Sequence, residues 1–141
     1  MFAWARTPDE AVDELATWAA SLPGDFGLDV HPHGELDELR LTGTLVSSGC
    51  RLSATLYIVA TVDGIGVPQY RFDLRTPDDD LVWRHDCHPG HTTEPGMTGE
   101  QHQHLIRSGA EVRVPDDFQT LASIREALVS ANLDLSEPGT D

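Results

Sequence analysis

The sequence contains no lysine. Its nine positive charges are all arginines, set against 24 acidic residues, and the formal net charge is −15. A surface this acidic repels nucleic-acid backbones and anionic membranes at long range, so the composition argues against a general binder of duplex DNA. It leaves open an enzyme that engages RNA locally and a module that docks on a basic protein. A GC-rich or salt-adapted source would produce the same composition, so the charge alone assigns no function.

Cysteine and long apolar runs are also scarce. The two cysteines, Cys50 and Cys87, lie far apart, and the opening residues MFAWARTPDE lack the basic stretch and apolar core of a secretory signal. We therefore expect a soluble cytoplasmic protein whose cysteines stay reduced. The longest strictly apolar run, residues 56–60, is far too short to span a bilayer, which predicts no membrane partner.

The chain length fits one domain, which we place at residues 1–134, followed by an acidic tail at 135–141 that we expect to be disordered. A helix should begin near the N-terminus, because Thr7 can cap it, Pro8 suits its first position and Glu10 completes a capping box. Apolar residues then recur at helical spacing. They are Ala11, Leu15, Trp18, Ala19 and Leu22.

Apolar and polar residues alternate over residues 39–87, which is typical of half-buried strands. Residues 25–35 contain Gly27, Pro32 and Gly34 and are predicted to form a loop, with their two histidines in a solvated turn. Short turns between consecutive strands favour antiparallel pairing. The predicted strands are 39–45, 52–60, 70–74 and 81–87, with shorter strand-like pieces at 101–106 and 111–114.

A second amphipathic helix is predicted towards the C-terminus, where Asp116 and Gln119 resemble a capping box. Its apolar stripe would contain Phe118, Leu121, Ile124, Leu128 and Ala131. The pattern as a whole predicts an α+β fold. We expect an antiparallel meander of about five strands, with an N-terminal and a C-terminal helix packed on one face.

Residues 81–106 hold most of the histidines and are the candidate functional region. Five of the seven histidines lie there: His85, His88, His91, His102 and His104. A polar loop rich in glycine and proline occupies residues 89–99, and long loops of this kind are often functional. On a strand, the side chains of His102 and His104 would project to one face, separated by roughly 6.5–7 Å along the backbone.

The same alternation sorts the residues of the preceding strand. If Trp83 faces the core, then Arg84, Asp86 and His88 share the opposite face. Cys87 falls on the core side with Trp83, which favours a buried thiol without a chemical role over an activated nucleophile.

Three functions fit this set of residues. In the first, one histidine removes a proton from a ribose 2′-hydroxyl, another protonates the leaving oxygen, and Arg84 or Arg107 offsets the charge on phosphorus. In the second, the cluster binds Zn²⁺ or another divalent transition metal. In the third, the histidines are surface residues without a role. Candidate metal ligands are His88, His91, His102 and His104, with Asp86 or Cys87 as further donors.

Three segments together resemble the TumE-like toxins of toxin–antitoxin pairs. They are YRFDL at residues 70–74, LVWRHD at 81–86 and GEQHQH at 99–104, and the resemblance covers residues 67–131. It implies a growth-inhibiting toxin, with RNA as the substrate and a cognate antitoxin protein as the partner. The residues that correspond by position are Asp86, His102 and His104.

Our leading hypothesis is therefore that the chain is a ribonuclease of the TumE-like type. Its candidate catalytic residues are Asp86, His102, His104, His88, His91 and Arg84. The alternatives are a non-catalytic acidic module that binds a basic protein, and a histidine-rich domain that binds metal.

Overall fold

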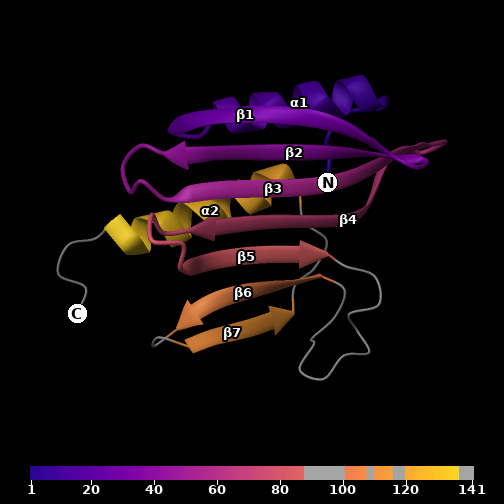
Figure 1. Cartoon of the computed structure of the whole chain (residues 1–141). Helices are drawn as coiled ribbons and strands as arrows, with labels where there is room; N and C mark the ends of the chain where they lie inside the picture. Colours follow the sequence, from indigo (N-terminus) through magenta and orange to yellow (C-terminus); the bar gives the residue numbers. More distant parts are fainter. Residues whose placement is uncertain (88–100, 108–109, 116–119, 137–141) are drawn as a thin grey trace.

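The computed structural model describes residues 1–87, 101–107, 110–115 and 120–136, and within them the chain forms two helices and seven strands. The strands make one sheet, in which each strand pairs antiparallel with the next in sequence (Figure 1). The predicted α+β meander with a helix at each end of the chain is confirmed. The elements are α1 (Pro8–Ala20), β1 (Gly24–His33), β2 (Leu36–Leu45), β3 (Arg51–Thr61), β4 (Gly64–Arg75), β5 (Leu81–Cys87), β6 (Gln101–Arg107), β7 (Ala110–Pro115) and α2 (Leu121–Ser136).

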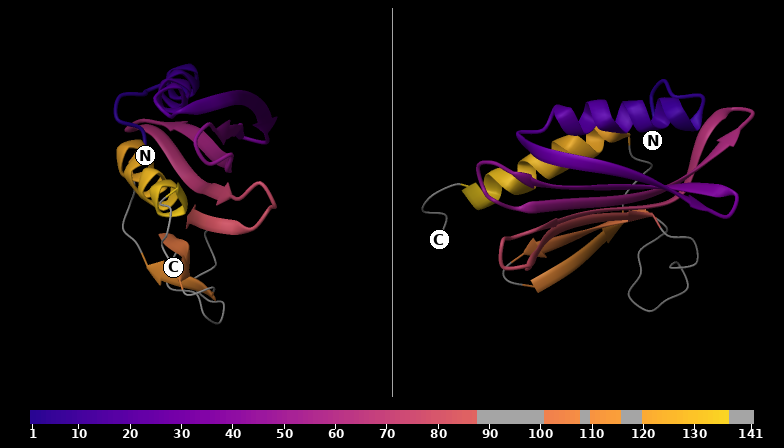
Figure 2. Two further views of the ribbon diagram at one scale, coloured as in Figure 1. Left: turned by 90° about the vertical axis from the view of Figure 1, so that its left-hand side faces the viewer. Right: turned by 45° about the horizontal axis from the view of Figure 1, so that its top comes forward.

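Both helices lie against the same face of the sheet, and no other helix of the described residues covers the opposite face (Figure 2). Along β3, Leu52 and Leu56 point towards the helices and are buried, whereas Arg51 and Ser53 are exposed. This follows from the alternation of side chains along a strand. We call this opposite side of β2–β5 the open face. Its side chains include Glu38, Arg40, Thr42, Thr44, Arg51, Ser53, Thr55, Tyr57, Arg71, Asp73, Arg75, Arg84 and Asp86.

Helix α1 begins as its sequence predicts. Thr7 is the N-cap, and its hydroxyl accepts the Glu10 amide proton at 3.2 Å. The Glu10 carboxylate in turn accepts from the Thr7 hydroxyl and the Arg6 amide. The predicted apolar stripe is buried throughout, so the helix packs on the sheet through the face that its spacing indicated. Its members are Ala11, Leu15, Trp18, Ala19 and Leu22.

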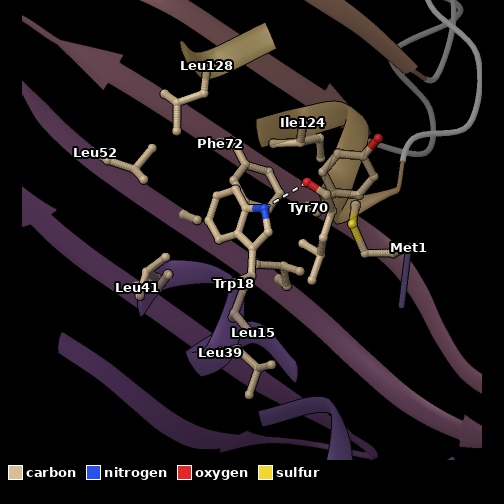
Figure 3. Close-up of a cluster of buried hydrophobic side chains, with 14 of the residues drawn as sticks. Met1, Leu15, Trp18, Leu39, Leu41, Leu52, Tyr70, Phe72, Ile124 and Leu128 are labelled. Atoms are coloured by element: carbon tan, nitrogen blue, oxygen red, sulfur yellow. Dashed lines mark hydrogen bonds between the residues drawn. The ribbon is translucent and has the colours of Figure 1, made fainter. Parts of the chain in front are cut away.

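Trp18 joins the two helices to the sheet. Its ring packs edge-on against Phe72 of β4, with 5.5 Å between the ring centroids, and its indole N–H donates to the Leu121 carbonyl at 2.7 Å (Figure 3). Ile124 and Leu128 of α2 complete the buried cluster. A tryptophan can be buried at low cost only when its N–H finds an acceptor, which here is the first residue of α2.

The segment before α1 also links the two helices. The buried carboxylate of Glu14 accepts hydrogen bonds from the amides of Ala3 and Trp4, each at 2.8 Å. The Met1 carbonyl accepts the Leu121 amide proton at 3.3 Å. These backbone contacts hold residues 1–5 against the helical layer.

The prediction of a loop at residues 25–35 is wrong, because residues 24–33 form strand β1. This strand lies at one edge of the sheet and pairs with β2 alone. Its side chains are exposed or half-buried, so it lacks the strong apolar alternation of a core strand, and an edge strand tolerates a residue such as Pro32. The turn lies at Gly34, whose φ of +65° favours glycine, and the two histidines are exposed at the end of β1.

Helix α2 extends from Leu121 to Ser136, two residues into the predicted tail. Thr120 precedes it, and its hydroxyl accepts the Ser123 amide proton at 3.1 Å, as an N-cap does. The predicted capping residues Asp116 and Gln119 lie outside the described residues, as do residues 137–141. In the part of the chain that is described, neither helix is long and apolar enough to cross a membrane.

Replacing Trp18 by alanine should lower the free energy of unfolding by about 3–5 kcal/mol, because it removes a buried ring and leaves the Leu121 carbonyl without its donor. Denaturant titration measures the change. Val62→Ala is the control, since Val62 is fully exposed and its truncation should change stability by less than about 0.5 kcal/mol. Equal midpoints for Trp18→Ala and the parent chain would contradict the packing role of Trp18.

Candidate functional site

Four charged residues on neighbouring strands form the centre of the open face. Arg71 and Asp73 alternate along β4, and Arg84 and Asp86 alternate along β5. The register sets Arg71 opposite Asp86 and Asp73 opposite Arg84, so each cation faces an anion. Opposite charges at such positions stabilise the pairing of the strands. We call these four residues the charge lattice.

The carboxylates of the charge lattice lie beneath its guanidinium groups. Asp86 and Asp73 are only 3% and 6% exposed, whereas the Arg71 side chain is 50% exposed. Arg71 Nε donates to Asp86 Oδ1 at 3.0 Å, and Arg84 Nε donates to Asp73 Oδ2 at 2.8 Å. Arg75 Nε donates to the other oxygen of Asp73 at 2.8 Å. An incoming ligand therefore meets arginine side chains that buried carboxylates hold in place.

Strand β6 places two histidines opposite the charge-lattice residues of β5. The register sets His102 opposite Asp86 and His104 opposite Arg84. The aspartate, the arginine and the HxH pair of the sequence prediction thus occupy facing positions on adjacent strands. The side chains of β6 lie outside the described part of the structure, and convergence of the imidazoles stays a prediction.

The predicted metal site combines the two histidines of β6 with two histidines that precede this strand in the sequence. His88 and His91 lie outside the described residues, so the structure does not test whether they join His102 and His104. Among the residues described, no group of three or more histidine, cysteine, aspartate or glutamate side chains could hold a metal ion. Metal binding by the four histidines stays a prediction.

His85 and Cys87 belong to the opposite, helix-covered side of β5. The His85 ring is 1% exposed and stacks on Tyr70, with 5.5 Å between centroids and 10° between planes. Trp83 is buried on the same side. The predicted position of Cys87 beside Trp83 in the core is confirmed, and both cysteines are buried thiols. Neither His85 nor Cys87 faces the charge lattice, so both are core residues.

The sequence analysis missed Arg71 and Asp73 as members of the candidate site. Both lie in the segment YRFDL, where the aromatic residues drew attention to the core side of β4. The sequence did contain a signal for them, because the short turn between β4 and β5 predicts that the two strands pair. Charged residues on the polar side of β4 had to meet those on the polar side of β5. The exact partners depend on the register, which shifts between Leu74 and Arg75.

A second ion pair lies on β2, away from the lattice. The buried Glu38 carboxylate accepts a short hydrogen bond from Arg40 Nε, and this contact lowers the pKa of Glu38 below its ordinary value of 4.5. The same contact raises the pKa of Arg40. His33 lies nearby, with its Nδ1 3.9 Å from Glu38 Oε2 and its ring 5.0 Å from that of Tyr57.

No protein-family model matches the chain, and no curated protein or solved structure matches it. Any functional assignment must therefore be supported by the residues of the open face and by the resemblance noted in the sequence.

Replacing Asp73 by asparagine should lower the free energy of unfolding by roughly 3 kcal/mol, because it removes the anion that two arginines share at a nearly buried position. Asp79→Asn is the matched control. Its ion pair with Arg51 joins side chains that are 69% and 53% exposed, so the loss should stay below about 1 kcal/mol. Denaturant titration compares the two variants. Equal losses would show that Asp73 is not a buried support of the lattice.

The Glu38–Arg40 pair should make stability depend on pH. Because the folded-state pKa of Glu38 lies below 4.5, its contribution is present above pH 4.5 and is lost as pH falls through the folded pKa. Unfolding free energies measured from pH 7 to pH 3 should therefore fall more steeply for the parent than for Glu38→Gln. Arg40→Gln removes the cause of the shift and should flatten the profile in the same way. Parallel profiles for all three chains would contradict the assignment.

Proposed function

We propose that this chain is a TumE-like toxin of a toxin–antitoxin pair and that it cleaves RNA on its open face through Asp86, His102 and His104. The register of β5 and β6 supports the proposal most, since it sets Asp86 opposite His102 and Arg84 opposite His104. Directly opposed residues of an antiparallel pair are close enough to interact through their side chains. A carboxylate beside an imidazole fixes its tautomer and stabilises its protonated form.

The proposed reaction uses the ribose 2′-hydroxyl as nucleophile. One imidazole removes the hydroxyl proton while the 2′-oxygen bonds to the adjacent phosphorus, and the other protonates the 5′-oxygen as its bond to phosphorus breaks. The products carry a 2′,3′-cyclic phosphate and a 5′-hydroxyl. Histidine suits both steps because its pKa is close to the working pH. His102 and His104 share the two roles.

Arg84 would stabilise the negative charge that develops on phosphorus. Its side chain is only 18% exposed, and its Nε and Nη2 each lie 2.8 Å from Asp73 Oδ2. A cation fixed in advance stabilises a transition state better than a mobile one, because it does not have to reorganise during the reaction. Arg71 would act similarly on the other side of Asp86, where its Nε donates to Oδ1.

The open face is much less acidic than the chain as a whole, which favours local contact with RNA. Over β2–β5 it carries five arginines against three carboxylates, and β1 adds Asp25 and Asp29 on the same side, so the charges balance there in a chain whose total is −15. The arginines are Arg40, Arg51, Arg71, Arg75 and Arg84, and the carboxylates are Glu38, Asp73 and Asp86. The acidic remainder of the surface would suit an antitoxin with a basic docking region. The expected cytoplasmic location belongs to the same proposal.

Expression of the chain without a partner should arrest growth, and His104→Ala should relieve the arrest. Removal of a general acid or base typically slows a reaction by about 10²- to 10⁴-fold. His31→Ala is the matched control, since His31 is exposed on β1, at the opposite end of the strand order from β6, and its loss should leave the arrest intact. Growth curves after induction provide the measurement. Normal growth with the unmutated chain would remove the main support for a toxin.

Cleavage in vitro separates the enzyme from the acidic binding module. The purified chain should cut single-stranded RNA and leave 2′,3′-cyclic phosphate ends, and RNA methylated at every 2′-oxygen should resist it. A binding module would keep its partner when His102 and His104 are both replaced and would cut neither RNA.

Elemental analysis of protein purified without a histidine tag tests the metal hypothesis, which near-stoichiometric zinc would favour.

A further inference from the structure

Two arginines face each other on the open face, next to the charge lattice. Arg51 on β3 lies directly opposite Arg75 on β4. Like charges at opposed positions destabilise a sheet unless an anion lies between them. The side chains are 53% and 32% exposed, so an anion can reach both from solvent.

A hollow of about 460 Å³ lies beside this arginine pair. Its size is within the range of small-ligand sites. Besides the two arginines, its lining includes the hydroxyl-bearing residues Thr42, Thr44 and Ser53, all exposed on β2 and β3. Arginine guanidinium groups and serine or threonine hydroxyls are the side-chain groups that most often bind the phosphates of nucleic acids.

In the folded chain Asp73 supplies the carboxylate that Arg75 binds, and Asp79 supplies the one that Arg51 binds. The Asp79 carboxylate accepts from Arg51 Nη2 at 2.5 Å, and its carbonyl accepts from Arg75 Nη1 at 3.0 Å. The Asp79 side chain is 69% exposed on a turn, and its φ of 72° is in the left-handed region. An exposed ion pair of this kind contributes little stability, so an incoming anion can replace the carboxylate at low cost.

The hollow adjoins the proposed catalytic residues. Asp73 lines it and also binds Arg84 on the next strand. Adjacent strands are about 4.8 Å apart, so the hollow and the charge lattice are continuous on one surface. A nucleic-acid strand with one phosphate at the lattice would have a neighbouring phosphate within reach of the hollow.

We infer that the hollow lined by Arg51, Arg75, Thr44 and Ser53 binds a phosphodiester group of single-stranded RNA, and that the Asp79 carboxylate occupies this position until RNA arrives. The inference rests on the proposed function for the identity of the ligand. It adds a second contact point on the substrate, away from the bond that is cut.

The test uses the full chain and a single-stranded oligonucleotide methylated at every 2′-oxygen, which cannot be cleaved through that oxygen. Fluorescence anisotropy over a range of salt concentrations gives the affinity. Arg51→Gln should weaken binding several-fold and reduce the slope of log K against log salt by about 0.7, the value for one phosphate contact on a single strand. Asp79→Asn should strengthen binding, because the competing carboxylate is gone.

Charge-matched variants on the helical side control for long-range electrostatics. Arg125→Gln changes the net charge as Arg51→Gln does, and Asp9→Asn matches Asp79→Asn. Both positions lie on helices, where Asp9 is exposed and Arg125 is half-buried against Ser21. Neither control should change the affinity or the salt slope beyond a small uniform shift. Circular dichroism melts verify that each variant is folded.

Equal effects of Arg51→Gln and Arg125→Gln would overturn the inference, and so would weaker binding by Asp79→Asn. Displacement of the oligonucleotide by inorganic phosphate at similar concentrations would also overturn it, since the hollow would then bind free phosphate. If the chain arrests growth but Arg51→Gln leaves the RNA affinity unchanged, the phosphate site in the hollow is refuted and the toxin hypothesis stands. If Arg51→Gln weakens RNA binding but the unmutated chain neither arrests growth nor cleaves RNA, the toxin hypothesis is refuted and the phosphate site stands.

Discussion

The pairing register between β4 and β5 is the constraint on which the rest of the open face depends. It aligns Arg71 with Asp86 and Asp73 with Arg84, so that four charges neutralise one another in pairs across two strands. A slip of β5 by one residue would turn Arg84 and Asp86 into the core and Trp83 and His85 out to solvent, while β4 would stay in register with β3. The same register that buries the aromatic residues therefore also builds the charged surface, and neither can change without the other.

The two faces of the sheet differ in burial and in charge. The covered face contains Phe72, His85 and Cys87, which are buried beneath the helices together with Trp18 of α1. The open face concentrates most of the arginines of an acidic chain over buried carboxylates. A net charge of −15 describes the whole molecule, but a ligand responds to the local field at the surface it approaches.

The sequence predicted the elements that have a strong period and missed the one that has none. The stripe of α1 and the alternation in β3 to β5 identified the core, including Trp18 and Cys87, because burial imposes a regular spacing on apolar residues. Strand β1 was not predicted, because an exposed edge strand needs no such spacing of apolar residues. In the candidate site, the polar side of β5 was predictable from alternation. The partners Arg71 and Asp73 were not identified, because pairing across strands depends on a register that contains an irregularity.

Strand β1 has a further consequence for how copies of this protein meet. Its outer backbone groups form one border of a long sheet, and such a border invites another extended chain to add to it. Pro32 has no N–H to offer to that chain, and the carboxylates of Asp25 and Asp29 repel an identical border. The molecule therefore carries its own protection against assembling into fibres from this side.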